Sequence, residues 1–178
     1  GGRGPVLLRA VSATSCYRTW GMLPGLPPLP TGATRYRAMV AITQLMSSSP
    51  VTVGPDDTLA TVREIFHHLK FHHLPVVEHH ALIGVVSDRD LLKALSPHLG
   101  SAAETTRDLA TLKKRVHQVM RRELVTLPAT GELMDAVRVF NREGVSCIPV
   151  VDDQGRPLGI LTWRDVMRAF DPEGTPGH

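Results

Sequence analysis

The fold is decided by the stretch Gly84-Val85-Val86-Ser87-Asp88-Arg89-Asp90, which returns in the chain as Gly159-Ile160-Leu161-Thr162-Trp163-Arg164-Asp165. The repetition extends outward from this stretch. Leu74-Pro75-Val76-Val77-Glu78 aligns with Ile148-Pro149-Val150-Val151-Asp152, at an offset of 74 residues. Self-similarity at a fixed period indicates that the chain contains two copies of one supersecondary unit.

Each copy predicts the order strand, helix, strand, strand, helix, because apolar residues recur at helical spacing between short apolar runs. The predicted strands are 51–53, 74–77 and 82–86 in the first copy, and 125–127, 148–151 and 158–161 in the second. The predicted helices carry Leu59, Val62, Ile65, Phe66, Leu69 and then Leu91, Leu92, Leu95 in the first copy, and Leu133, Ala136, Val137, Phe140 and then Val166, Met167, Phe170 in the second. A unit of about 55 residues buries little surface alone. We therefore expect an α+β fold in which two β-α-β-β-α repeats pack sheet to sheet as one pseudo-symmetric domain.

The boundaries follow from composition. We expect repeat 1 over residues 39–98, repeat 2 over 116–170, and a connecting helix over 99–115 that begins with a capping box at Ser101–Glu104. Its apolar stripe consists of Leu109, Leu112, Val116 and Val119. Residues 1–38 are rich in Pro, Gly and Arg and predict a disordered leader or an added tail, and residues 171–178 predict a flexible C-terminus.

Charge and cysteine content exclude several classes of protein. The net charge is +3, but residues 1–55 hold five arginines and no acid, so the remainder is slightly acidic and a nucleic-acid role is not expected. No apolar run reaches the roughly 18 residues that a membrane span takes. Two distant cysteines, Cys16 and Cys147, form no disulfide framework and fit a reducing, cytoplasmic setting.

Three motifs per copy resemble a known family, the tandem cystathionine-β-synthase (CBS) domains, also called Bateman modules. They are Met-x4-Val-Thr-Val/Leu, apolar-Pro-Val-Val-acid and Gly-apolar-apolar-Ser/Thr-x-x-Asp, and they cover about residues 42–95 and 116–170. The resemblance implies a stand-alone regulatory module rather than an enzyme, with no required cofactor. It would bind AMP, ADP, ATP or S-adenosylmethionine in clefts between the repeats, form a homodimer through its helices, and signal to an unidentified partner protein.

The resemblance also implies the site residues. Ser87 and Thr162 would contact phosphate or ribose, Asp90 and Asp165 the ribose, and Arg89 and Arg164 the phosphate. One cleft would join Ser87 and Asp90 to Val125, Val145, Ser146 and Cys147, and the other would join Thr162 and Asp165 to Val51, Phe71, His72 and His73. Because the second cleft offers an aromatic ring and two imidazoles, we expect it to be the one that favours a charged nucleotide.

Simpler interpretations stand beside these predictions. Ser87-x-x-Asp90 and Thr162-x-x-Asp165 are also capping boxes, which need no ligand. Six histidines gather at positions 67, 68, 72, 73, 79 and 80, but no Cys or acid completes a tetrahedral set, so no metal site is predicted. The basic residues Lys113–Arg115, Arg121 and Arg122 favour a solvated face. The alternatives to nucleotide binding are a ligand-free interaction scaffold and a metal-responsive protein that uses the histidines.

Overall fold

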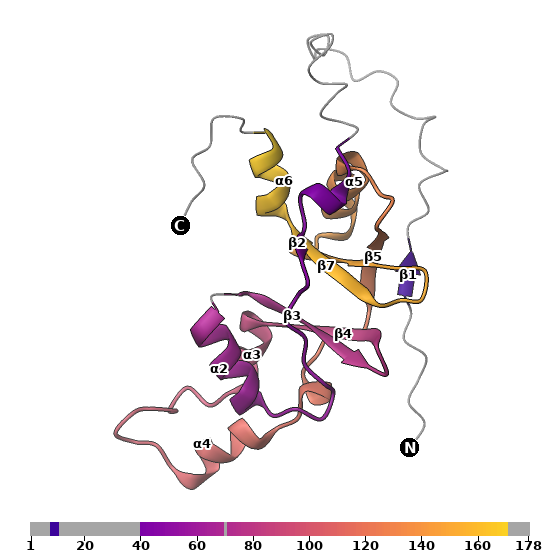
Figure 1. The fold of residues 1–178 in the computed structure, drawn as a ribbon. Coiled ribbons are helices and arrows are strands. Elements are labelled where there is room, and N and C mark those ends of the chain that lie inside the picture. The colour runs from indigo at the N-terminus through magenta and orange to yellow at the C-terminus, as the bar shows by residue number, and fades with distance from the viewer. Residues whose placement is uncertain (1–7, 11–39, 70, 171–178) are drawn as a thin grey trace. The chain divides into compact units, whose positions relative to one another are not determined.

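The computed structural model describes residues 8–10, 40–69 and 71–170, which fall into two compact units (Figure 1). Of the described residues, unit 1 comprises 8, 49–69, 71–124 and 154–157. Unit 2 comprises 9–10, 40–48, 125–153 and 158–170. None of the helices in the described ranges has the length and apolar character that crossing a membrane requires.

Unit 1 is built on the antiparallel strands β3 (His73–Glu78) and β4 (Ala81–Ser87). The helices α2 (Leu59–Leu69) and α3 (Asp88–Ala94) flank them in the chain, followed by α4 (Thr106–Ala110) and the 3-10 turns η3 (Thr111–Lys113) and η4 (Val116–Gln118). The core of unit 1 consists of Val53, Leu59, Val62, Leu74, Val76, Val86, Leu91, Val116 and Met120.

Unit 2 contains most of a five-stranded sheet in the order β1-β5-β6-β7-β2. The strands are β1 (Leu8–Ala10), β2 (Ser47–Ser48), β5 (Leu124–Pro128), β6 (Cys147–Val151) and β7 (Pro157–Thr162). Its helical elements are η2 (Ile42–Gln44), α5 (Leu133–Glu143) and α6 (Trp163–Phe170). The core of unit 2 consists of Ile42, Leu127, Leu133, Ala136, Val139, Ile148, Val150, Leu161 and Val166.

The predicted α+β fold with two repeats of the same element order is confirmed, with one difference in the first copy. Val53 makes a single parallel bridge to Val76 instead of a strand. The aligned residues of the second copy, Leu127 and Val150, pair within β5 and β6. Pro55 follows Val53 closely and has no N–H to extend the ladder, which accounts for the shorter pairing. The packing of one sheet on the other stays a prediction.

The start of each sequence repeat belongs to the unit of the other repeat. Ile42 N–H donates to Gly131 O at 3.1 Å, and the aligned Val116 N–H donates to Asp57 O at 2.9 Å. Leu133 N–H donates to Val40 O, and the aligned Leu59 N–H donates to Lys114 O, both at 2.9 Å. Segment 40–48 of repeat 1 therefore contacts repeat 2 at the same aligned positions at which segment 114–124 contacts repeat 1. These two segments are here called the exchanged segments.

Each exchanged segment also joins the last strand of the unit that receives it. Ser47 of β2 pairs with Ile160 of β7, and the aligned Arg121 forms an antiparallel bridge with Val85 of β4. A Cβ added at Gly84 would lie 2.6 Å from Met120 Sδ, and one added at Gly159 would overlap Met46 Sδ. The Met and the Gly of the repeated motifs therefore contact each other in both units, and a side chain in place of either glycine would displace the methionine that packs there.

The connecting region differs from the single helix expected over residues 99–115. Its helix α4 spans five residues, and its capping box is Thr105 with Asp108 rather than Ser101 with Glu104. Ser101 Oγ donates to His98 O at 2.7 Å, and Glu104 Oε2 accepts from Gly100 N–H at 2.7 Å. These bonds close a turn before the helix begins, so Ser101 and Glu104 do not cap it. Val116, expected on the helical stripe, instead lies in η4 and fills the core of unit 1.

The predicted leader contains one described element, the strand β1, which lies beside β5 at an edge of the sheet. At these three positions the structure has a strand where the sequence predicted disorder. The rest of the predicted leader and the predicted flexible residues 171–178 lie outside the described residues.

Truncating the buried side chain of an exchanged segment is predicted to loosen the unit that receives it. Ile42→Ala should lower the free energy of unfolding by about 2–5 kcal/mol, because Ile42 is fully buried in unit 2. In native-state hydrogen exchange, protection should fall in α5. The matched variant Val116→Ala should lower protection in α2. If Ile42→Ala lowered protection in α2 instead, the assignment of segment 40–48 to unit 2 would be contradicted.

Acid is predicted to weaken the connecting region through Asp108. Hydrogen bonds from Ser96 Oγ and from Thr105 lower the pKa of Asp108 to about 2 from 3.8. Because the pKa is lower in the folded chain, the carboxylate contributes stability above about pH 4, and this contribution is lost as the pH falls towards 2. Melting temperatures measured across this window should fall less steeply for Asp108→Asn than for the unmodified chain. An equal slope for both would show that Asp108 does not carry the effect.

Candidate functional site

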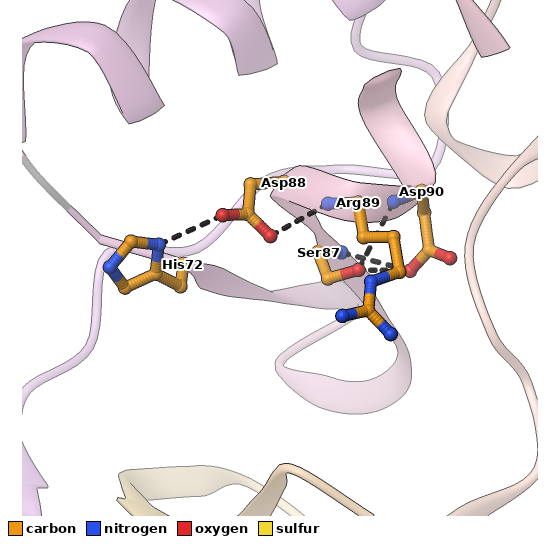
Figure 2. A network of polar contacts seen from close by, with 5 residues as sticks. All are labelled: His72, Ser87, Asp88, Arg89 and Asp90. Carbon is orange, nitrogen blue, oxygen red and sulfur yellow. Dashed lines mark hydrogen bonds and ion pairs between the residues drawn. The ribbon is translucent and has the colours of Figure 1, made fainter. Parts of the chain in front are cut away.

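The first candidate segment lies where β4 ends at Ser87 and α3 begins (Figure 2). Asp90 N–H donates to Ser87 Oγ at 3.2 Å, and Ser87 N–H donates back to Asp90 Oδ2 at 3.1 Å. The Ser87 hydroxyl also donates to Asp90 Oδ2 at 2.5 Å. The capping-box interpretation is therefore confirmed for this copy, and it fixes the hydroxyl and the carboxylate side by side.

Two histidines that the prediction placed in the other cleft lie beside this segment in unit 1. His73 is paired in register with Ser87, and Asp88 N–H donates to His72 O at 3.1 Å. His72 Nδ1 lies 2.8 Å from Asp88 Oδ2, and the second oxygen of Asp88 accepts from Arg89 N–H at 2.6 Å (Figure 2). The antiparallel hairpin produces this arrangement, because the start of β3 lies opposite the end of β4.

Burial is the main influence on the nearby imidazole of His73. It lowers the pKa of His73 from 6.5, since desolvation penalises the charged ring. Asp88 opposes this most strongly, and Asp90 opposes it less, while His72 and Arg121 act in the same direction as burial. The ring is consequently neutral at neutral pH.

The second candidate segment lies where β7 leads into α6 in unit 2. Thr162 N–H donates to Asp165 Oδ2 at 2.8 Å, and the Thr162 hydroxyl donates to the same oxygen at 2.6 Å. Asp165 is buried, and its other oxygen lies 3.5 Å from Arg168 Nη1. Trp163 is exposed, and the guanidinium of Arg164 lies 5.6 Å from its ring centroid. A hydroxyl and a carboxylate are thus placed together in both units, with an arginine between them in sequence.

The remaining predicted residues are distributed between the two units. Val51 packs on the core of unit 1, whereas Val125 and Val145 pack on the core of unit 2. Phe71 is exposed just before β3, and the half-buried Cys147 begins β6. Ser146 and Cys147 align with His72 and His73, and Cys147 begins β6 as His73 begins β3. The two clefts that combine these residues across the repeats stay a prediction.

The histidine cluster does not converge on one point. Within the part of the chain that the structure describes, no group of three or more His, Cys, Asp or Glu side chains could hold a metal ion. His67 and His68 contact each other edge to face at 5.2 Å between ring centroids. His79 and His80 form the turn between β3 and β4, with φ of 50° and 67°.

Several residues of the basic cluster bind backbone carbonyls. Lys114 Nζ donates to Ala94 O at 2.7 Å, at the C-terminal end of α3. Arg115 Nη1 donates to Asp56 O at 2.6 Å, and Arg122 Nη2 donates to His117 O at 3.1 Å. These contacts give three of the five basic residues a structural role.

Two residues of the candidate segments were missing from the predicted site. They are Asp88 and Trp163, which occupy the same aligned position between the hydroxyl and the arginine. The sequence signal was present, because this position is acidic in one copy and aromatic in the other. The motif consists of the residues that the two copies share, so it leaves out a position at which they differ.

Comparison with known proteins identifies both copies. The model of the CBS domain matches residues 42–97 and 116–172. A CBS domain-containing protein of Dictyostelium discoideum is 32% identical over 130 residues, which cover 72% of this chain and 89% of that protein. Other curated relatives are longer: the chain spans 35% of an uncharacterised protein of Methanocaldococcus jannaschii, at 26% identity, and 21% of the inosine-5'-monophosphate dehydrogenase of that organism.

Solved structures of the same fold contain adenosine ligands. CBSX2 in complex with AMP is 28% identical with a TM-score of 0.61, covering 74% of this chain and 96% of that one. The CBS domain pair of protein MJ0100, in complex with 5'-methylthioadenosine and S-adenosyl-L-methionine, is 25% identical with a TM-score of 0.63, covering 76% of this chain and 99% of that one.

Proposed function

The chain belongs to the CBS domain family, and from that premise we propose that it is a regulatory module that binds adenosine-containing ligands and signals their presence to a partner protein. The observation that carries the proposal is the pair of complete Ser/Thr-x-x-Asp segments. In each, a hydroxyl donates to a carboxylate oxygen, at 2.5 Å in unit 1 and at 2.6 Å in unit 2. The solved relatives with AMP, S-adenosyl-L-methionine and 5'-methylthioadenosine supply the ligand class.

The chemistry of these segments suits a nucleoside. A carboxylate has about four lone-pair positions on two oxygens, so Asp90 can keep its cap through Oδ2 and still accept hydrogen bonds from ribose hydroxyls. Asp165 has the same cap, and its Oδ1 would be shared between a ribose hydroxyl and Arg168. Arg89 and Arg164 offer guanidinium groups to an anionic ligand. A ligand held in this way changes no covalent bond, which agrees with a regulatory rather than a catalytic role.

A ligand-free scaffold is the second candidate function, and one observation favours it. Each hydroxyl and carboxylate of the candidate segments is already satisfied by the other within its own turn. The fold therefore needs no ligand to complete these helix starts, and a protein partner could be the only binding partner.

We further propose that the protein forms a homodimer through α3 and α6. Trp163, Met167 and Phe170 of α6 are 52%, 59% and 44% exposed, and Leu92 of α3 is 73% exposed. The three residues on α6 lie four and three positions apart, so they share one helical face. Apolar side chains grouped on a helix face favour contact with a second apolar surface, and a second copy supplies an identical one.

The dimer predicts that a charge on these helices separates the subunits. Leu92→Glu combined with Met167→Glu should raise the dissociation constant at least tenfold, because a charged side chain would be buried at the interface. Sedimentation velocity over a concentration series measures this. Leu109→Glu, on the exposed face of α4, is the matched control and should leave the constant unchanged. A wild-type chain that stays monomeric at all concentrations would contradict the dimer.

Ligand binding predicts that Asp90→Ala and Asp165→Ala together abolish a saturable response to AMP, ADP, ATP or S-adenosylmethionine. Each substitution should also cost about 1 kcal/mol of folding free energy through the lost cap. Calorimetric titration and ligand-induced shifts in melting temperature provide the measurements. Asp108→Ala removes a cap of the same type on α4 and should leave affinity unchanged.

Unchanged affinity in the double variant would contradict the assigned site. The absence of saturable binding of any of these ligands to the wild-type chain would select the scaffold.

A further inference from the structure

The two candidate segments differ at the position that follows the hydroxyl. Unit 1 has Ser87-Asp88-Arg89-Asp90, whereas unit 2 has Thr162-Trp163-Arg164-Asp165. We propose that Asp88 is a specificity-determining residue, which makes the Ser87 segment select adenosine compounds without a phosphate over nucleotides. This inference rests on the proposed function and deepens it by naming the ligand class of one segment.

The carboxylate of Asp88 is held in place from two sides. One oxygen accepts from Arg89 N–H at 2.6 Å, and the other lies 2.8 Å from His72 Nδ1 (Figure 2). The side chain is nevertheless 45% exposed, so its charge faces solvent. A carboxylate bonded through both oxygens is held in a defined position.

Asp88 also takes up a backbone donor at the start of α3, because its carboxylate accepts from the N–H of Arg89. A phosphate that contacts Ser87 and Arg89, as proposed above, would compete with Asp88 for this N–H. An incoming phosphate loses this hydrogen bond and also meets a fixed negative charge. In unit 2 the aligned side chain is the uncharged ring of Trp163, which presents neither obstacle.

The charges beside Asp88 are of both signs. Arg89 and Asp90 follow it in the chain, and His72 Nδ1 lies 2.8 Å from its Oδ2. Replacing Asp88 with Asn leaves these groups in place, so the comparison isolates the charge of Asp88.

The size of the effect follows from Coulomb's law. Two unit charges about 6 Å apart, at effective dielectric constants between about 80 and about 20, change a binding constant by about threefold to about a hundredfold. We expect about tenfold against AMP. An uncharged nucleoside meets no such repulsion.

The experiment uses the full chain with Asp165→Ala, here called the parent, so that binding reports on the Ser87 segment. Titration calorimetry with adenosine and with AMP gives the two affinities. Adding Asp88→Asn should raise AMP affinity about tenfold and leave adenosine affinity within about twofold. Asp88→Glu keeps the charge and should resemble the parent. Glu64→Gln, on the exposed side of α2, removes one negative charge elsewhere in unit 1 and should change neither affinity.

Each other outcome overturns a definite claim. Equal changes for AMP and adenosine would show that Asp88 only shapes the segment, and no change in either would show that it does not select. If the parent binds neither compound while the wild-type chain binds both, the Ser87 segment holds no ligand and this inference fails alone. If the wild-type chain also binds neither, the proposed function fails as well.

Discussion

The structure depends on one exchange of backbone and side chains between the two sequence repeats. Ile42 is fully buried in the core of unit 2, and Val116 is fully buried in the core of unit 1. Each unit would otherwise lack a core residue and the hydrogen bonds that order the start of its first helix. Neither repeat, taken as a length of sequence, is complete, which explains why a motif of about 55 residues occurs here as a pair.

The same exchange holds the candidate segments. Met120 crosses β4 at Gly84, three residues before Ser87, and Met46 crosses β7 at Gly159, three residues before Thr162. The strand that presents each hydroxyl is thus fixed by a segment of the other repeat. A ligand that shifts either strand would also move the methionine packed on it. Because protein interiors are closely packed, this movement would reach the rest of the exchanged segment.

Local patterns in the sequence predicted most elements, and non-local contacts account for what they missed. The apolar stripe of Leu133, Ala136 and Phe140 predicted α5, because helical periodicity is a property of a single segment. The exchange joins residues that are far apart in the sequence, such as Ile42 with Gly131 and Val116 with Asp57, and no local pattern encodes that pairing. In the connecting region the sequence offers two capping boxes, and only the one at Thr105 has a distant partner, because Ser96 donates to Asp108. The pairing of His72 with Asp88 needed the register of the hairpin.

The reciprocal bridges have a consequence for the origin of the chain. Ala41 bridges Glu132, and Thr58 bridges Arg115, so that aligned positions contact each other in both directions. A contact set of this kind is what two identical, separate chains make in an isologous dimer. A half-length ancestor could have made every such contact with a second copy of itself. Gene duplication and fusion would then have turned a concentration-dependent assembly into an intramolecular one. Once fused, the copies could diverge, and they now differ at the aligned positions Asp88 and Trp163.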